Sequence, residues 1–254
     1  MPEAINNYLA DRNMTRVRQT HRDIHNLYRI DASQYDEEHK LKIRKIYDLV
    51  PSNLENKKKR IVAKDIQGRA GDRFSRYIEE FEYLVSSGIA LDVHAVSNPK
   101  YPLSESVQKN LLKLYLNDVG MLTAKLYANN VNAVMSDERS VNLGAVYESV
   151  VAQELSAHGF RLFYYDNRKN GEVDFLIDDY KNSSILPIEV KSGRDYTIHS
   201  ALNKLLGNKD YHVNSGMVLC NEREVRHVGH ITYMPIYYVM FLDANVTDSE
   251  GEIF

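Results

Sequence analysis

The spacing of apolar residues changes near the middle of the chain, and this change limits the fold more than any other feature of the sequence. Before about residue 143, apolar residues recur every three or four positions, as in amphipathic helices. After it, short apolar runs of strand length alternate with helical segments. A chain of 254 residues with both patterns is expected to be an α/β (α+β) protein, with a helical first half and a sheet in the second.

The first half is expected to contain helices followed by a two-stranded hairpin. Helical spacing covers residues 14–32, 41–50, 61–67 and 74–85. Pro51 is expected to end the second helix, because proline disfavours helical geometry in the residue before it. Alternation then predicts strands at 89–96 and 113–116. This order is typical of a winged helix, whose third helix enters a DNA major groove. Winged helices also dock onto proteins, so that alternative stays open.

Charge is distributed unevenly along the chain. Residues 1–142 hold 22 Lys and Arg against 19 Asp and Glu, whereas the rest holds 10 against 16. Between residues 57 and 76, eight basic side chains face only two acidic ones. Such a density of like charge favours a polyanionic partner, here duplex DNA, and the alternative is a solvated basic face. The predicted DNA-binding residues of this segment are Lys57, Lys58, Lys59, Arg60, Lys64, Arg69, Arg73 and Arg76.

The second half is expected to alternate between strands and helices. Helices are predicted at 140–159 and 198–206. Strands are predicted at 160–165, 173–177, 185–190 and 217–220, with extended segments at 225–228 and 236–242. The polar residues 178–184 predict that the second and third strands pair as a hairpin. Glu148 lies on the apolar flank of the first helix, where a carboxylate needs a cation or a metal.

Three charged residues interrupt the predicted hairpin. Glu189 and Lys191 flank Val190, so both side chains project to the same face of their strand. Asp174, on the paired strand, can share that face. Two carboxylates a few ångströms apart attract a hard divalent cation, Mg²⁺ or Mn²⁺, which supports phosphodiester cleavage. The Lys191 ammonium would orient the attacking water or stabilise the developing negative charge.

Three further basic residues lie close in sequence to these charges. Arg168 and Lys169 occupy the turn before Asp174, and Arg194 follows Lys191. They are predicted to contact phosphates near the site.

Asp174 followed by Glu189-Val190-Lys191 resembles the motif of the PD-(D/E)xK nuclease superfamily, with Val173 in place of the proline. Glu148 is similar to the additional helical acid of many members. The elements from Leu143 to Cys220 follow the α-β-β-β-α-β order of that restriction-endonuclease-like core. The resemblance implies that Asp174, Glu189 and Lys191 are catalytic and that Glu148, Asp174 and Glu189 bind the metal.

Four short strings more narrowly resemble the C-terminal domain of unknown function of bacterial and archaeal AAA-type ATPases. They are Leu114–Gly120, Gly144–Glu148, Glu172–Phe175 and Glu189–Gly193. Those proteins carry a Walker A loop upstream, and the sequence here contains none. We therefore expect an upstream ATPase module as partner in a full-length protein, and neither a bound nucleotide nor ATP hydrolysis by this chain.

We expect the chain to fall into four parts. They are an N-terminal helical segment (1–39), a winged-helix-like DNA-binding region (40–126), a nuclease-like domain (127–242) and a mobile acidic tail (243–254). The single cysteine, Cys220, excludes an internal disulfide and a zinc site built on cysteine pairs. No apolar run approaches the roughly 20 residues that span a bilayer, so no membrane partner is predicted. With no signal peptide at the N-terminus, a cytoplasmic location is expected.

These features support three hypotheses of different classes. The first is a DNA-binding winged helix coupled to a Mg²⁺-dependent endonuclease-like domain. The second is a non-catalytic DNA-binding or regulatory arm of an ATPase, in which the charged residues form a structural ion-pair cluster. The third is a protein-interaction module whose basic helix docks an acidic partner.

Overall fold

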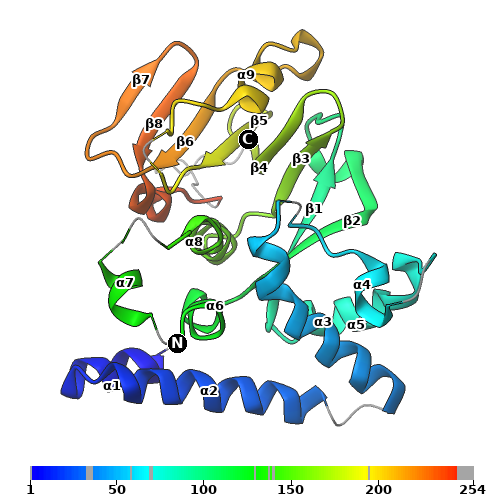
Figure 1. Cartoon of the computed structure of the whole chain (residues 1–254). Helices are drawn as coiled ribbons and strands as arrows, with labels where there is room; N and C mark the ends of the chain where they lie inside the picture. Colours follow the sequence, from blue (N-terminus) through cyan, green and yellow to red (C-terminus); the bar gives the residue numbers. More distant parts are fainter. Residues whose placement is uncertain are drawn as a thin grey trace, which may run out of the picture. The chain divides into compact units, whose positions relative to one another are not determined.

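A computed structural model of the chain describes residues 2–244, apart from 33–36, 58, 69–70, 129, 137, 139–140 and 194 (Figure 1). At Glu37 and Lys109 only the main chain is described. The predicted acidic tail, except for 243–244, therefore lies outside the described residues. Within the described ranges, no helix is both long and apolar enough to cross a membrane.

The chain is a mixed α/β protein, with a run of helices before the first strand. The helices are α1 (Pro2–Asp11), α2 (Met14–Asp31), α3 (Glu37–Glu55), α4 (Ala63–Gln67), α5 (Ile78–Ser86), α6 (Val119–Leu126), α7 (Val131–Met135), α8 (Gly144–Ala157) and α9 (Ser200–Leu206). The 3₁₀ helices are η2 (Phe74–Tyr77), η3 (Leu103–Ser106), η4 (Lys209–Tyr211) and η5 (Ile236–Phe241). The strands are β1 (Ala90–Val96), β2 (Val107–Leu116), β3 (Phe163–Asn167), β4 (Gly171–Asp179), β5 (Ser184–Val190), β6 (Gly216–Cys220), β7 (Arg226–Val228) and β8 (Ile231–Pro235).

The chain divides into two compact units, each made of two segments. Unit 1 comprises Met1–Asp92 and Asn110–Val150, and unit 2 comprises Val93–Lys109 and Val151–Phe254. The elements β1, β2 and α8 each contribute residues to both units.

Helix α3 of unit 1 does not end at Pro51, contrary to the prediction. Its buried stripe runs from Ile43 through Val50 to Leu54, and Leu54 is only 1% exposed. Burial of a leucine contributes about 1.5–3 kcal/mol, which offsets the hydrogen bond that proline removes. The helix therefore continues for one turn beyond the proline.

The helix predicted at 74–85 is two elements, the 3₁₀ helix η2 and the α-helix α5. Tyr77, between them, leaves helical geometry with φ −125° and ψ 12°. Its side chain is fully buried, and its hydroxyl donates a hydrogen bond to the carboxylate of Asp72. Placement of this large side chain and its hydroxyl interrupts the regular helix.

The hairpin predicted after this helix is present as β1 and β2, but it is not a separate two-stranded wing. His94 to Val96 of β1 pair in parallel with Phe163 to Tyr165 of β3. The eight strands form one sheet in the order β2-β1-β3-β4-β5-β6-β8-β7. The helical order of a winged helix is thus followed by strands of a larger sheet.

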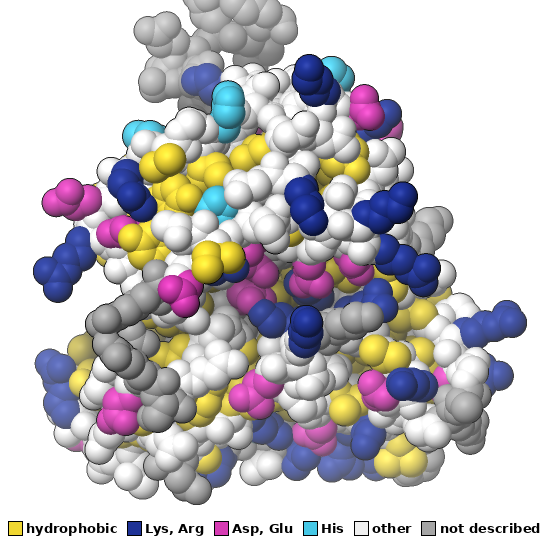
Figure 2. All heavy atoms as spheres, turned by 45° about the horizontal axis from the view of Figure 1, so that its top comes forward, with side chains coloured by type: hydrophobic (Ala, Val, Ile, Leu, Met, Phe, Trp, Pro, Cys, Tyr) yellow, Lys and Arg dark blue, Asp and Glu magenta, His cyan; other side chains and the backbone are white. Residues whose placement is uncertain are grey.

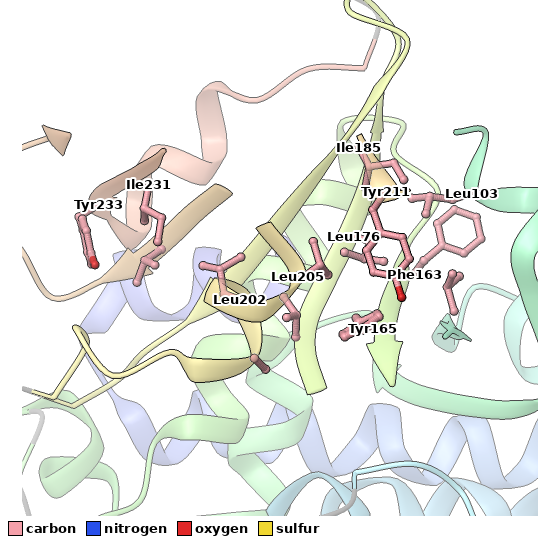
Figure 3. Packing of buried hydrophobic residues seen from close by; sticks show 14 of the residues in the cluster. Leu103, Phe163, Tyr165, Leu176, Ile185, Leu202, Leu205, Tyr211, Ile231 and Tyr233 are labelled. Carbon is pink, nitrogen blue, oxygen red and sulfur yellow. The ribbon is translucent and has the colours of Figure 1, made fainter. Parts of the chain in front are cut away.

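In unit 2, strands β3, β4 and β5 form an antiparallel meander, and β6 pairs in parallel with β5. Helix α9 packs Leu202 and Leu205 into a core that includes Leu176 of β4 and Phe163 of β3 (Figure 3). The element order from α8 to β6 is the α-β-β-β-α-β order that the sequence predicted.

The prediction of an extended segment at 236–242 is wrong. The strand lies one segment earlier, as β8, and η5 follows it. Pro235 ends the strand because it has no N–H group for further sheet pairing. In η5 only Val239 is buried, whereas a half-buried strand would bury every second side chain.

A buried histidine joins three helices within unit 1. The Nε2 of His25 on α2 donates to the main-chain oxygen of Met121 on α6 at 3.1 Å, because a carbonyl can only accept. Its Nδ1 then accepts from the Tyr47 hydroxyl on α3. Burial, with a smaller contribution from Lys125, lowers the pKa of His25 from 6.5 to about 4.

We expect the stability of the protein to fall as pH decreases from about 6.5 to 4. In this range the unfolded chain binds a proton at His25 and the folded chain does not, which costs up to about 1.4 kcal/mol per pH unit. Urea unfolding between pH 7.5 and 5 measures this slope. His25→Gln should reduce it, whereas His227→Gln, at an exposed histidine, should not. Equal slopes in the protein and the His25→Gln variant would contradict the assignment.

Candidate functional site

The hairpin of β4 and β5 brings Asp174 next to Glu189. The antiparallel ladder runs from Asp179–Ser184 to Phe175–Ile188, so the next positions along the two strands are Asp174 and Glu189. The main-chain N–H of Val190 donates to Oδ2 of Asp174 at 2.8 Å. The carboxylate is therefore fixed against the main chain of the strand that carries the second acid.

A β-bulge in β4 directs Asp174 toward β5. Phe163 pairs with Leu176 and Tyr165 pairs with Val173, so three steps on β4 match two on β3. Strict alternation would place Val173 and Leu176 on opposite faces, yet both pack in the same core cluster. Bulges commonly re-aim a side chain at a functional site. Here the extra residue lies within the segment that holds Asp174.

Lys191 pairs with Glu189 at the end of β5. Its Nζ lies 2.7 Å from Oε1 of Glu189, whose side chain is only 9% exposed, while that of Lys191 is 28% exposed. The N–H of Lys191 donates to the Leu219 oxygen at 2.8 Å, which continues the pairing of β5 with β6. The structure thus brings two of the three predicted catalytic side chains, Glu189 and Lys191, into direct contact, and places Asp174 at the adjacent position of β4.

Glu148, the predicted third metal ligand, lies on α8 and belongs to unit 1. It is 4% exposed. The Lys59 ammonium donates to its Oε1, and the Tyr115 hydroxyl donates to its Oε2 at 3.2 Å. A lysine thus provides the cation that burial of Glu148 requires. Lys59, predicted to bind DNA, pairs with this acid in the structure.

Two of the predicted metal ligands, Asp174 and Glu189, occupy adjacent positions on neighbouring strands. In the part of the chain that is described, no three His, Cys, Asp or Glu side chains form a group that could hold a metal ion. The three-carboxylate site therefore stays a prediction.

Most of the other predicted phosphate contacts are accessible. The exposed ones are Lys57, Lys64, Arg73, Arg76, Arg168 and Lys169. Arg60 is half-buried, and Lys58, Arg69 and Arg194 lie outside the described residues. The Arg76 guanidinium pairs with Asp72 at 3.0 Å but keeps 63% of its side chain exposed. On the face shown in Figure 2, basic side chains lie among acidic ones and do not form one continuous basic surface.

Helix α5, the third helix of the winged-helix order, has an acidic exposed side. Glu79 and Glu82 are both exposed, whereas Arg73 lies outside this helix, immediately before η2. Carboxylates at these positions would repel phosphates of a bound duplex. Any attraction for phosphates would therefore come from basic residues around the helix rather than from α5 itself.

The structure adds a cluster that the sequence did not indicate. Tyr196, Glu222, Arg226 and Tyr233 lie together in unit 2, with the Arg226 guanidinium 5.0 Å from the Tyr233 ring and 6.0 Å from that of Tyr196. The pairing of Arg226 with Tyr233 creates this cluster. The sequence does not predict this cluster, because it does not predict strand β8, which carries Tyr233.

Comparison with known families decides the family of the chain. A family model described as a domain of unknown function, DUF8612, matches residues 1–132, more than half of the 254 residues. The chain belongs to this family. A second model, also described as a domain of unknown function, DUF4143, matches residues 143–239, which include all four residues predicted to form the catalytic and metal site. No curated protein and no solved structure matches the chain.

The pair of Lys59 and Glu148 should be required for the stability of unit 1. Lys59→Met leaves a buried carboxylate without its main cation, at a cost of about 3 kcal/mol. The double variant Lys59→Met/Glu148→Gln should recover most of this loss in urea unfolding. Lys57→Met, at an exposed neighbouring lysine, should change the free energy of unfolding by less than about 0.5 kcal/mol. Equal losses from the two single lysine variants would contradict a buried pair.

Proposed function

We propose that unit 2 is a nuclease-like domain that cleaves phosphodiester bonds in DNA with the help of a divalent metal ion. The observation that carries the proposal is the fixed group of Asp174, Glu189 and Lys191 on adjacent strand positions. A buried carboxylate such as that of Glu189 is costly, and costly buried charges are concentrated at functional sites.

The donor chemistry of this group fits Mg²⁺ or Mn²⁺. Asp174 and Glu189 supply carboxylate oxygens, which hard divalent cations prefer, and both side chains are held in place. Glu148 is a candidate third ligand by resemblance alone. When bound, such an ion would neutralise phosphate charge and acidify a water molecule.

The protein's own residues would position the substrate. Val190 fixes the Asp174 carboxylate through its N–H group, so this ligand needs no reorganisation when substrate binds. Lys191, partly exposed, can turn its ammonium from Glu189 to a phosphate oxygen and stabilise the negative charge that develops there. Arg168 and Lys169, in the turn before Asp174, would hold neighbouring phosphates.

Unit 1 would supply the remaining affinity for duplex DNA. Its exposed basic side chains, Lys57, Lys64, Arg73 and Arg76, support this role, and the exposed acids of α5 argue for contacts to phosphates rather than to base edges. The DUF4143 match, a domain known as a C-terminal domain associated with AAA-type ATPases, supports an ATPase module as partner. We further propose a cytoplasmic location, on the sequence argument alone.

Cleavage of DNA in the presence of Mg²⁺ or Mn²⁺ tests the proposal. Linear, circular and branched substrates should be cleaved. Asp174→Asn removes a carboxylate of the proposed metal site, and Lys191→Met removes the ammonium that would stabilise charge on the phosphate, so each should lower the rate by at least about 100-fold. Asp179→Asn is the control, since it makes the same change at the other end of β4, where the side chain bonds Asn182. Equal behaviour of the protein and the Asp174→Asn variant on every substrate would exclude the catalytic role.

A second candidate function is a non-catalytic DNA-binding or regulatory domain with the same fold. Two observations favour it: the buried acids Glu148 and Glu189 each already have a lysine partner. Paired in this way, the charges form a structural cluster that needs no metal.

A thermal melt with Mg²⁺ or with a chelator separates the two functions. A metal at about 100 times its dissociation constant stabilises a protein by about 2.7 kcal/mol, which raises Tm by about 5–10 °C at this size. We expect this rise in the protein and not in the Glu189→Gln variant, while Asp179→Asn should keep it. An unchanged Tm would favour the ion-pair cluster.

A further inference from the structure

Arg226 is held in a fixed position on the outermost strand of the sheet. Its guanidinium lies over the rings of Tyr196 and Tyr233, and one of its nitrogens is 3.8 Å from the Glu222 carboxylate. The Tyr196 hydroxyl donates to the same carboxylate, and Nε2 of His199 lies 2.6 Å from the Tyr233 hydroxyl. Both rings are therefore themselves anchored.

The side chain of Arg226 nevertheless stays 49% exposed. At 3.8 Å the contact with Glu222 is an ion pair rather than a close hydrogen bond. The planar guanidinium therefore keeps donors that can face solvent or a ligand, and its stacking on two rings reduces the entropy that binding would cost.

Register across the sheet relates Arg226 to the proposed catalytic group. Glu189 pairs with Val218, Val218 with Tyr233, and Tyr233 with Arg226. Paired residues of neighbouring strands project to the same face, so Arg226 lies in the same row as Glu189. Three strand spacings of about 4.8 Å separate them, or about 14 Å in all. Such a distance suits a contact to the same ligand at a phosphate other than the reacting one.

We propose that Arg226, positioned by Tyr196, Tyr233 and Glu222, binds a backbone phosphate of the DNA strand whose reacting phosphate lies at Asp174 and Glu189. The inference rests on the proposed function and extends it, because it gives the substrate a direction across the strands. Arg168 and Lys169, at the turn between β3 and β4, lie on the opposite side of the catalytic group in the order of the strands. The strand would thus be held on both sides of the bond that is cut.

Binding of a fluorescein-labelled DNA duplex, measured by anisotropy in the Asp174→Asn background, tests this site without cleavage. Arg226→Ala should weaken binding about tenfold, since a charge-assisted bond contributes about that factor, and should lower the salt dependence by about one phosphate contact. Arg223→Ala is the control, because it removes the same charge from an exposed position in the loop just before β7. Equal losses from the two variants would reduce the effect to net charge and overturn the site.

Two further measurements keep the test decisive. Arg226→Lys retains the charge but loses the planar stacking. We therefore expect the salt dependence of its DNA binding to match that of the Asp174→Asn protein with Arg226 intact, and its affinity for DNA to be lower. Inorganic phosphate at an equal phosphate concentration should not displace the duplex, and displacement would indicate a site for single phosphates instead. If the Asp174→Asn protein, the parent variant of these tests, binds DNA and Arg226→Ala in the same background binds equally well, only this inference fails. If the parent variant does not bind DNA at low salt, the proposed function fails with it.

Discussion

The hydrogen bond from the Val190 main chain to Asp174 is the contact on which the arrangement of the candidate site depends. It forms where the regular ladder between β4 and β5 has ended, so a side chain takes up a main-chain donor. The bulge in β4 makes this possible, because it moves Asp174 out of strict alternation. Glu189 and Lys191 then follow from the ordinary two-residue period of β5. The irregular residue in β4 thus lies beside the charged residues of the candidate site.

In both units, buried carboxylates are paired with basic side chains. Each buries acids that would be costly alone, and each supplies basic partners from nearby elements. In unit 1, Glu80 is 1% exposed and lies 2.9 Å from Nδ1 of His39 and 3.4 Å from Nζ of Lys42. Glu148 has Lys59. In unit 2, Glu189 has Lys191, whose greater exposure leaves it able to exchange its partner for a ligand.

Much of the fold could be predicted because periodicity reports which face of an element is buried. The hairpin of β4 and β5 and the position of Lys191 follow from alternation and a polar turn. Features set by tertiary contacts could not be predicted. The continuation of α3 past Pro51 depends on the burial of Leu54, and the orientation of Asp174 depends on register with β3. Short helices such as α6 and α7 were missed, since eight and five residues carry little periodic signal.

The parallel pairing of β1 with β3 joins residues that are far apart in sequence, such as His94 and Phe163. Strand β1 precedes most of unit 2 in the chain, so during synthesis the edge that pairs with β3 is exposed until β3 has been made. An unpaired strand edge is a template for aggregation. Contacts of this separation also slow folding. Neither unit is a continuous stretch of chain, so a cut near residue 142 would not release an intact half. The two family matches lie one after the other in sequence, so the boundary between them does not coincide with the boundary between the compact units.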